Sequence, residues 1–292
     1  MLKSVAIYSK ESNPRTASCI STLLREFCKR GIRIYIHQRT FDDPGCSEKP
    51  LIEKFDDIKA LDTIPDLVLS VGGDGTFLET MLRVREPGIP IAGVNAGRMG
   101  FLANISEDDL ASSVDLLCQG RYKVLERSLI EFRKPEGVFD NESSVALNEV
   151  TIQKADPSMI TITVFVDGVH LNTYWADGLI VSTATGSTAY NLSVGGPILS
   201  PEDESLIISP ISPHNLTIRP IVISGDSILR MVVEGRSCEY LATCDFRSRR
   251  LPFSEEILIS RAEKKLKTVM PEGRDFYSTL RNKLMWGADR RN

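Results

Sequence analysis

The segment DLVLSV at residues 66–71, followed at once by GGDGT at 72–76, decides the fold of the N-terminal half. The first six residues are mostly apolar, which is typical of a buried strand, and residues 77–85 have the pattern of a helix. Glycines between a strand and a helix indicate a tight turn. The order strand, turn, helix is that of a parallel sheet covered by helices.

Strand and helix patterns alternate on both sides of this segment. Residues 4–9 and 89–95 are predicted to be buried strands, and the apolar residues of 20–28 recur at helical spacing. A further helix is expected to start near Ser106 and to end at Gly120. This alternation predicts an α/β domain with a mainly parallel, Rossmann-like sheet and helices on both faces.

Two other stretches of this half are expected to lie at the surface. Ile32, Ile34 and Ile36 alternate with polar residues, which predicts a strand covered on one face. His37, at the end of this strand, is therefore expected to face solvent. Residues 40–62 are polar and irregular, and we expect a surface excursion there.

After Tyr122 the pattern becomes that of an all-β domain. The strand-like stretches are 124–133, 145–153, 160–174, 221–223, 228–234 and 255–260. Asp167-Gly168 predicts a hairpin turn within the third of them, and helical spacing returns only from Phe276 onward. We predict an α/β domain at 1–122 and a β-rich domain at 123–270, with 271–292 packing back on the first domain.

The composition argues against several classes of protein. The 292 residues include 35 lysines and arginines against 39 acidic residues, and a net charge of −4 disfavours a protein that coats nucleic acid. No two of the six cysteines form a C-x-x-C pair, so zinc ribbons and thioredoxin-like chemistry are not expected. No apolar run approaches the ~18 residues of a membrane-spanning helix. We expect a cytoplasmic protein without a nucleic-acid or membrane partner.

The glycine-rich turn GGDGT is the first candidate site. Bare backbone lets N–H groups approach a polyphosphate, and open α/β sheets bind ligands at the carboxyl edge of their strands. The carboxylate of Asp74 would repel phosphate unless a divalent cation or a hydroxyl donor lay between them. Alternatively, Asp74 only caps the following helix. The chain has neither G-x-G-x-x-G nor a P-loop, which disfavours dehydrogenases and P-loop ATPases.

Three further stretches carry polar residues that could bind a ligand. GVNAGRMGFL at 93–102 follows another strand and is expected to converge with GGDGT on one crevice. Asn148-Glu149 suits ribose hydroxyls or base edges, or is an ordinary solvated strand end. The stretch 177–190 contains Asp177, five hydroxyl side chains without a cationic partner and the ring of Tyr190. It suits a neutral polyol such as ribose, although a structural turn rich in Ser and Thr would look similar.

Together these segments resemble the NAD kinase family over nearly the whole chain. The resemblance rests on GGDGT, GVNAGRMGFL, LNE at 147–149, the stretch 177–199, SPHNLTIRPIVIS at 212–224 and the C-terminal DFYSTLRNKLMW. It implies a β-sandwich-like second domain and a homo-oligomer, either a dimer or a tetramer. It also implies phosphoryl transfer from ATP or polyphosphate, with Mg²⁺ or another divalent metal, to the adenosine-ribose 2′-hydroxyl of NAD.

The resemblance implies roles for individual residues. Asp74 would accept the proton of the hydroxyl group, late in a loose transition state, because an ordinary carboxylate is too weak a base to remove it in advance. The residues that would bind NAD are Asp74, Gly75, Asn148, Glu149, Asp177, Thr185, Thr188, Ala189, Tyr190, Asn191, Leu192, Ser193 and Arg247. The loop that would bind the donor phosphates consists of Gly72, Gly73, Gly75, Thr76, Asn95 and Gly97. No metal ligand from the protein is predicted.

Two positions depart from the family pattern. Trp175 stands where many relatives have a basic residue, and Arg247 lies in Cys-Asp-Phe-Arg where relatives often have a small or amide residue after Cys-Asp. Both bear on contacts to phosphate or nicotinamide. Two other functions stay open at this point: a kinase of the same type that acts on a sugar phosphate or a lipid, and a non-catalytic dinucleotide-binding regulator.

Overall fold

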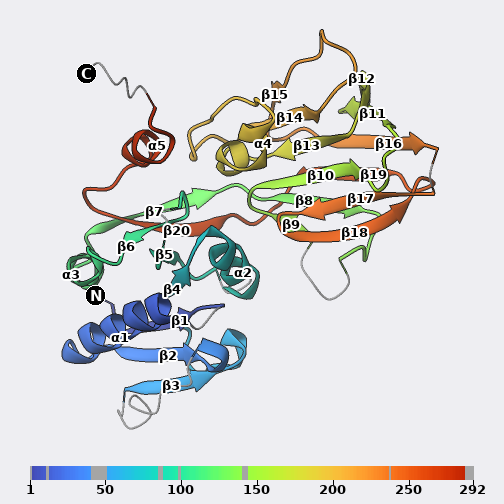
Figure 1. Cartoon of the computed structure of the whole chain (residues 1–292). Coiled ribbons are helices and arrows are strands. Elements are labelled where there is room, and N and C mark those ends of the chain that lie inside the picture. The colour runs from blue at the N-terminus through green and yellow to red at the C-terminus, as the bar shows by residue number, and fades with distance from the viewer. Residues whose placement is uncertain are drawn as a thin grey trace. The chain divides into compact units, whose positions relative to one another are not determined.

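Strand β4 (Leu67–Gly72) lies inside a parallel sheet, as its sequence predicts. The structure is a computed structural model that describes residues 2–10, 13–40, 51–84, 88–97, 100–139, 144–236 and 238–286. The chain forms two units (Figure 1), of which unit 1 comprises Met1–Glu126 and Leu266–Asn292, and unit 2 comprises Arg127–Lys265. The domain limits drawn from the sequence remain a prediction.

The sheet of unit 1 has the strand order β3-β2-β1-β4-β5-β20-β7, with β6 paired to β5. These strands are β1 (Ser4–Tyr8), β2 (Arg33–His37), β3 (Ile52–Phe55), β5 (Ile91–Asn95), β6 (Ala103–Ser106), β7 (Tyr122–Arg127) and β20 (Leu266–Pro271). Because β1 pairs in parallel with both β2 and β4, the order of strands reverses beside β4. Ligands of open α/β sheets bind at such a point, outside the carboxyl ends of the strands.

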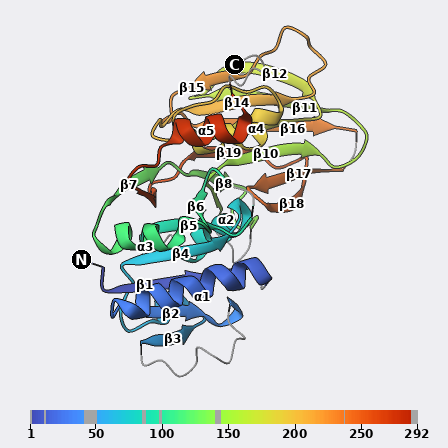
Figure 2. The same cartoon turned by 60° about the vertical axis from the view of Figure 1, so that its left-hand side comes forward.

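Helices cover both faces of this sheet, which confirms the predicted fold class of the first half. The helices of unit 1 are α1 (Pro14–Lys29), α2 (Asp74–Val84), α3 (Leu110–Cys118) and α5 (Phe276–Leu284). Helices α1 and α3 share one buried core with Leu69 of β4 (Figure 2). Helix α2 lies on the opposite face, because its Thr80 hydroxyl donates to that of Ser70, whose side chain points away from that of Leu69.

Two expectations for this half need correction, the irregular structure of residues 40–62 and the exposure of His37. Ile52–Phe55, within the expected excursion, form strand β3 and pair in parallel with β2, while residues 41–50 lie outside the described part of the chain. His37 is fully buried. Its imidazole ring lies edge-on to the rings of Tyr8 and Phe55, with centroids 5.0 and 5.3 Å away. Strand β2 is therefore covered at His37 by Tyr8 and Phe55, which belong to other strands and which the alternation of residues within β2 cannot reveal.

Unit 2 consists of two six-stranded antiparallel sheets, which confirms the predicted all-β class of the second half. Their orders are β15-β14-β13-β10-β17-β18 and β12-β11-β16-β19-β8-β9. The strands are β8 (Ile130–Lys134), β9 (Val145–Ala146), β10 (Glu149–Lys154), β11 (Ile160–Val166), β12 (Val169–Ala176), β13 (Gly178–Ser182), β14 (Leu206–Ile211), β15 (Ile221–Ile223), β16 (Leu229–Gly235), β17 (Glu239–Cys244), β18 (Arg247–Pro252) and β19 (Ile257–Arg261). Side chains of both sheets, such as Val181 and Met231, share one core.

The hairpin predicted at Asp167-Gly168 joins β11 to β12. Both residues have positive φ angles, 51° and 82°, as a two-residue turn of the primed type requires. The Asp167 carboxylate also accepts the Ile228 N–H at 2.8 Å, which ties the turn to the chain before β16. The backbone preferences of Asp and Gly thus explain the turn. The hydrogen bond from Ile228 to Asp167 is compatible with the same turn geometry.

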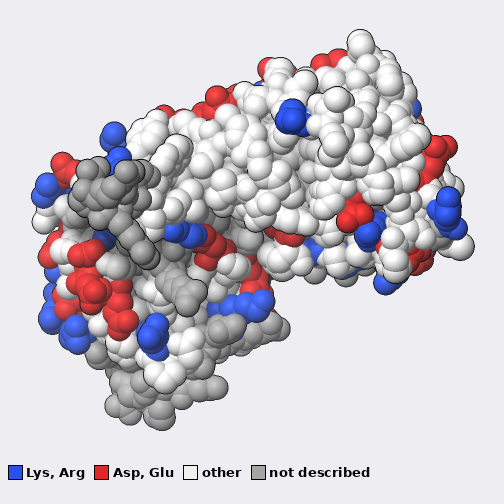
Figure 3. Space-filling view, turned by 45° about the horizontal axis from the view of Figure 1, so that its top comes forward, with Lys and Arg blue, Asp and Glu red and all other residues white. Residues whose placement is uncertain are grey.

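Charge is distributed without a single dominant patch on the face shown in Figure 3. Acidic and basic side chains alternate over the part that holds unit 1, and the part that holds β12, β14 and β15 shows few charged side chains.

Among the residues that the structure describes, no helix combines the length and the apolar character that crossing a bilayer requires.

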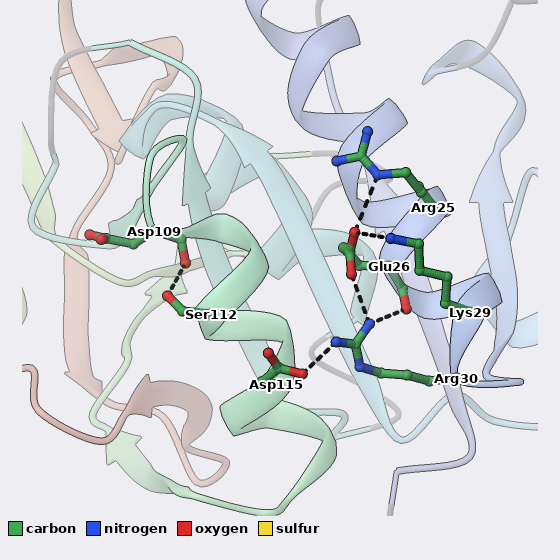
Figure 4. Close-up of polar contacts among 7 residues, drawn as sticks. All are labelled: Arg25, Glu26, Lys29, Arg30, Asp109, Ser112 and Asp115. Carbon is green, nitrogen blue, oxygen red and sulfur yellow. Dashed lines mark hydrogen bonds and ion pairs between the residues drawn. The ribbon is translucent and has the colours of Figure 1, made fainter.

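An ion network around Glu26 joins α1 to α3 (Figure 4). Arg30 donates to Glu26 Oε2 at 2.9 Å and, through its other terminal nitrogen, to Asp115 of α3. Lys29 lies 3.0 Å from Glu26 Oε1. Hydrogen bonds from Arg30, Lys29 and Arg25 lower the pKa of Glu26 from 4.5 to about 2. Ionised Glu26 therefore links the two helices over most of the pH range.

Candidate functional site

Asp74 is the first residue of α2, and its carboxylate faces the second glycine-rich segment. Oδ1 accepts the N–H groups of Leu102 and Ala103, and Oδ2 accepts that of Phe101, each at 3.0 Å. The alternative in which Asp74 only caps its own helix is therefore wrong. Position at a helix N-terminus adds a favourable interaction with the helix dipole. The carboxylate thus links the start of α2 to the residues that lead into β6.

Glycine is required where the two segments meet. A Cβ on Gly100 would lie 1.9 Å from Asp74 Oδ1, so any other residue there would displace the carboxylate. Within the turn after β5, the Gly97 N–H donates to Asn95 Oδ1 at 2.7 Å. Residues 98 and 99 lie outside the described part of the chain. The two strand ends converge within unit 1, as the sequence predicts.

The rest of the GGDGT turn has open backbone. Gly73 and Gly75 are exposed, and no atom lies within 4 Å of the place that a Cβ would occupy on either. Gly72 is different, because a Cβ there would lie 2.4 Å from Thr76 Oγ1. Glycine at this position lets the Thr76 hydroxyl fold back over the turn. Accessible N–H groups next to a helix N-terminus are what a phosphate-binding loop needs.

A lysine from the C-terminal segment lies beside Asp74. Lys283 of α5 places Nζ 3.7 Å from Asp74 Oδ2 and 4.3 Å from the centroid of the Phe101 ring. Both side chains of this ion pair are about one-third exposed, 33% for Lys283 and 31% for Asp74. Sequence reasoning missed Lys283, although it lies in the C-terminal DFYSTLRNKLMW motif. Only the return of the tail to the sheet reveals the contact.

In unit 2, a second carboxylate organises the LNE segment. Asp245, between β17 and β18, accepts the N–H groups of Leu147, Asn148 and Glu149 at 2.9, 2.8 and 3.3 Å. Its φ angle of 51° is unusual for a residue other than glycine and turns the chain back toward LNE. Sequence reasoning missed Asp245. An acidic residue in the turn between two strands was the available signal.

Glu149 carries a strongly perturbed carboxyl group. Burial raises its pKa from 4.5 to about 8, the negative charge of Asp245 acts in the same direction, and the Tyr190 backbone N–H opposes both. Oε2 of Glu149 is buried without a hydrogen-bond partner among the described residues. Burial also raises the pKa of Asp245. A protonated Glu149 can donate as well as accept a hydrogen bond, which suits the mixed edge of a base or a ribose.

The Ser/Thr-rich stretch packs directly on the LNE segment. Thr183 donates through its hydroxyl to the Leu147 carbonyl at 2.5 Å and through its N–H to that of Asn148 at 2.9 Å. A Cβ on Gly186 would lie 2.0 Å from the backbone carbonyl oxygen of Asn148, so only glycine lets the turn pack this closely on the LNE segment. Buried hydroxyls such as Ser187 bond to backbone carbonyls of the turn. Several of the hydroxyl groups are thus structural, whereas the sequence left the two interpretations open.

The turn η4 (Thr185–Thr188) and helix α4 (Tyr190–Ser193) hold the other residues expected to bind NAD. Asn191 is fully buried and donates to the carbonyls of Ser187 and Pro197. Tyr190 is exposed. The part-exposed or exposed residues of this set are Thr188, Ala189, Leu192 and Ser193. Tyr190 is thus partly accessible from solvent, and Asn191 shapes the turn.

Two cations were missed by sequence reasoning. The Arg127 guanidinium donates to Thr185 Oγ1 at 3.2 Å, so the hydroxyl cluster does have a cationic partner. Lys154 at the end of β10 lies 2.6 Å from the Asp177 carboxylate. The Asp177 carboxylate is therefore paired with a lysine, and its contact with a hydroxyl pair of the ligand stays a prediction. Both cations come from strands distant in sequence, so the local pattern gives no sign of them.

Arg247 lies inside unit 2. It is only 4% exposed, its guanidinium donates to the Val145 carbonyl of β9, and it stacks 5.7 Å from the centroid of the Phe139 ring. Its positive charge also opposes the rise in the pKa of Asp245. These contacts support β9 and the LNE segment from within. A direct contact of Arg247 with NAD stays a prediction.

Two domain families match most of the chain. Residues 10–122 match the ATP-NAD kinase N-terminal domain, and residues 147–270 match the ATP-NAD kinase C-terminal domain. The NAD kinase of Flavobacterium johnsoniae is 39% identical over 294 residues, covering 99% of each chain.

Solved structures show the same fold. Yeast NADH kinase complexed with NADH superposes with a TM-score of 0.85, covering 99% of this chain and 89% of its own. An NAD kinase from Archaeoglobus fulgidus in complex with ATP gives a TM-score of 0.75, covering 97% of this chain and 98% of its own. At 23% identity, both support the fold alone. On the domain matches and the full-length similarity to the Flavobacterium enzyme, this chain belongs to the NAD kinase family.

Proposed function

We propose that this enzyme transfers the γ-phosphoryl group of ATP to the 2′-hydroxyl of the adenosine ribose of NAD, giving NADP and ADP. The observation that carries the proposal is the setting of Asp74, a partly exposed carboxylate held by three backbone N–H groups beside an open glycine turn. Family membership supports NAD as the acceptor over a sugar phosphate or a lipid.

Asp74 Oδ2 is the atom proposed to accept the proton. A carboxylate oxygen has two lone pairs, and both lone pairs of Oδ1 are used by Leu102 and Ala103. Oδ2 uses one for Phe101, and Lys283 at 3.7 Å is too distant to hydrogen-bond to the other. The remaining lone pair can accept the ribose O–H. The ribose oxygen then bonds to Pγ, the bond from Pγ to the β,γ-bridging oxygen breaks, and the proton moves to Oδ2.

The dinucleotide is proposed to bind through residues of unit 2. Asn148 and Glu149 would contact the adenosine, and Tyr190 would stack on a flat ring of the ligand. Asp177, Thr188, Ala189, Asn191, Leu192 and Ser193 complete the proposed set, together with Asp74 and Gly75. Thr185 and Arg247 belong to the same proposed set of NAD contacts; both are largely buried, and Arg247 also supports β9 from within.

The donor is proposed to enter as MgATP. The open backbone of GGDGT would supply N–H groups for its phosphates, and the turn at Asn95 and Gly97, whose Gly97 N–H is used within the turn, would border them. Within the described residues, no three His, Cys, Asp or Glu side chains gather to hold a metal ion. Without such a cluster, the described residues fit a cation that is held mainly by the triphosphate, which is the usual state of Mg²⁺ at nucleotide sites. Bound there, Mg²⁺ would neutralise phosphate charge.

We also propose that the enzyme is a homo-oligomer of the cytoplasm. Trp175, Leu216, Ile221 and Val222 of unit 2 are exposed, and exposed apolar side chains of this size are typical of interfaces. The buried thiols of Cys19 and Cys244 are unpaired, as expected in a reducing compartment. Light scattering after gel filtration tests the oligomer, and a dimer or tetramer is the expected result.

A coupled assay tests the reaction. ATP and NAD are incubated with the enzyme, and an NADP-specific dehydrogenase reports any NADP by absorbance. Parallel reactions with polyphosphate as donor, or with NADH, fructose 6-phosphate or diacylglycerol as acceptor, define the substrates. ATP-dependent formation of NADP supports the proposal. Binding of NAD without any ATP-dependent product would instead indicate a dinucleotide-binding regulator.

A further inference from the structure

Lys283 belongs to the C-terminal motif, which has no part in the function proposed above. Its Nζ lies 3.7 Å from Asp74 Oδ2 and 4.3 Å from the centroid of the Phe101 ring. The same Phe101 donates its backbone N–H to Asp74 Oδ2 at 3.0 Å. One loop residue therefore contacts the carboxylate through its backbone and the ammonium through its ring. This shared contact fixes the two charges relative to one another.

Helix α5 is held firmly enough to aim Lys283. Just before the helix, Arg274 donates to the Asn104 carbonyl of β6 and lies 2.9 Å from the Asp109 carboxylate. Leu280, one turn before Lys283, is buried. The ammonium thus reaches Asp74 from an element with a defined position, and not from a free chain end.

The electrostatics of the GGDGT turn call for such a cation. A polyphosphate that approaches bare backbone beside Asp74 also approaches a negative charge. Among the described residues, Lys283 is the basic side chain that forms an ion pair with Asp74. The Coulomb interaction of charges about 4 Å apart near a protein surface is large enough to change a dissociation constant about tenfold or more. Lys283 can therefore offset the repulsion between the Asp74 carboxylate and the phosphates of the donor.

We propose that Lys283 is a positioning residue that acts through Asp74. Its charge offsets that of the carboxylate so that the anionic donor can bind beside it, while the 3.7 Å separation leaves a lone pair of Oδ2 for the acceptor hydroxyl. This inference rests on the proposed function. It assigns a role to the returning C-terminal helix, which brings the missing positive charge to the turn.

Steady-state kinetics provide the first test. For Lys283→Met we expect the KM for ATP to rise about tenfold, with the KM for NAD and the melting temperature nearly unchanged. Lys283→Arg keeps the charge and should restore most of the loss. Arg281→Met is the matched control, because it removes the same charge from the same helix at a residue not paired with Asp74. Equal effects of the Lys283 and Arg281 variants would overturn the proposal.

A double-mutant cycle separates action through Asp74 from direct contact with phosphate. Calorimetry measures ATP binding to the wild type, Lys283→Met, Asp74→Asn and the double variant. We expect the tenfold loss from Lys283→Met to shrink to about twofold or less when residue 74 is already neutral, because the ion pair with Asp74 no longer holds the ammonium beside the turn. An undiminished loss in that background would refute a positioning role. If the wild type made no NADP, the proposed function would fail, while these binding data would still test the charge pair.

Discussion

Replacing Asp74 by Asn tests whether its carboxylate does chemistry as well as holding a loop. Asn keeps one oxygen, which can still serve Leu102 and Ala103, but its amide nitrogen then faces the Phe101 N–H, donor against donor. Loss of one hydrogen bond to a charged group costs about 1.5–3 kcal/mol. We therefore expect unit 1 to lose about 2 kcal/mol, which corresponds to a fall in Tm of about 4–8 °C.

The same substitution removes the proposed proton acceptor. A positioned general base contributes about 10²–10⁴-fold to the rate. We expect kcat to fall at least about 100-fold while the Kd for NAD stays within about twofold, because most proposed NAD contacts lie in unit 2. The coupled assay measures kcat, calorimetry measures the Kd, and differential scanning calorimetry measures Tm.

Asp66→Ala is the control for the structural part of this effect, because an Asn oxygen at position 66 could keep both hydrogen bonds that the carboxylate accepts. Asp66 Oδ2 also accepts two backbone N–H groups of unit 1, from Lys3 at 2.7 Å and Ser4 at 3.0 Å. Its variant should show a comparable fall in Tm with kcat nearly unchanged. If the two variants lost the same small fraction of kcat, Asp74 would have a structural role only, and the proposed mechanism would be refuted.

Three further predictions concern stability and binding. Because the folded Glu149 holds a proton up to a pKa of about 8 and the unfolded residue only to 4.5, its contribution to stability is complete below pH 4.5 and is lost as the pH rises toward 8. Glu149→Gln should reduce the dependence of the free energy of unfolding on pH, which is at most about 1.4 kcal/mol per pH unit for one group. Urea titrations from pH 5 to 9 measure this dependence, and an unchanged value would contradict the burial argument. The pKa of Glu26 is lowered to about 2, so its contribution is present above pH 4.5 and is lost on acidification, and Glu26→Gln should remove that part of the fall in Tm between pH 5 and 3. Gly186→Ala should destabilise unit 2 by about 1–3 kcal/mol and weaken NAD binding in calorimetry, because its Cβ would meet the Asn148 oxygen at 2.0 Å, and wild-type binding would show that the turn adapts.

Local periodicity predicts much of the fold. The strand at 67–72 and the helix that follows it are correct because a buried apolar run and a glycine turn leave few alternatives. Strand β3 was missed because an edge strand of four residues with only Ile52 and Phe55 apolar has no clear pattern. His37 was misplaced because the cover of β2 comes from Tyr8 and Phe55, which belong to other strands.

The candidate site was predictable to a lesser extent, since its partners lie far apart in sequence. Glycine-rich strand ends indicate where a ligand loop lies, and Asp74 is in such a loop at the end of β4. They do not indicate which N–H groups the carboxylate accepts, because Phe101 to Ala103 reach it only after β5 has paired with β4. Asp245 lies almost a hundred residues from the LNE segment that it holds. Such contacts depend on strand order, which local pattern does not encode.

The two units use the same device in opposite electrostatic settings. Asp74 and Asp245 each accept three consecutive backbone N–H groups, at 101–103 and at 147–149. Beside Asp245 lies another acid, Glu149, whose pKa is raised by burial and by the charge of Asp245, so that a protonated Glu149 can share hydrogen bonds with the adenosine. Beside Asp74 lies the ammonium of Lys283, an opposite charge 3.7 Å from Oδ2. The first setting suits binding and the second suits orienting a hydroxyl group for transfer. The neighbouring charge, more than the N–H cradle, therefore distinguishes the proposed catalytic carboxylate from the one that shapes the binding site.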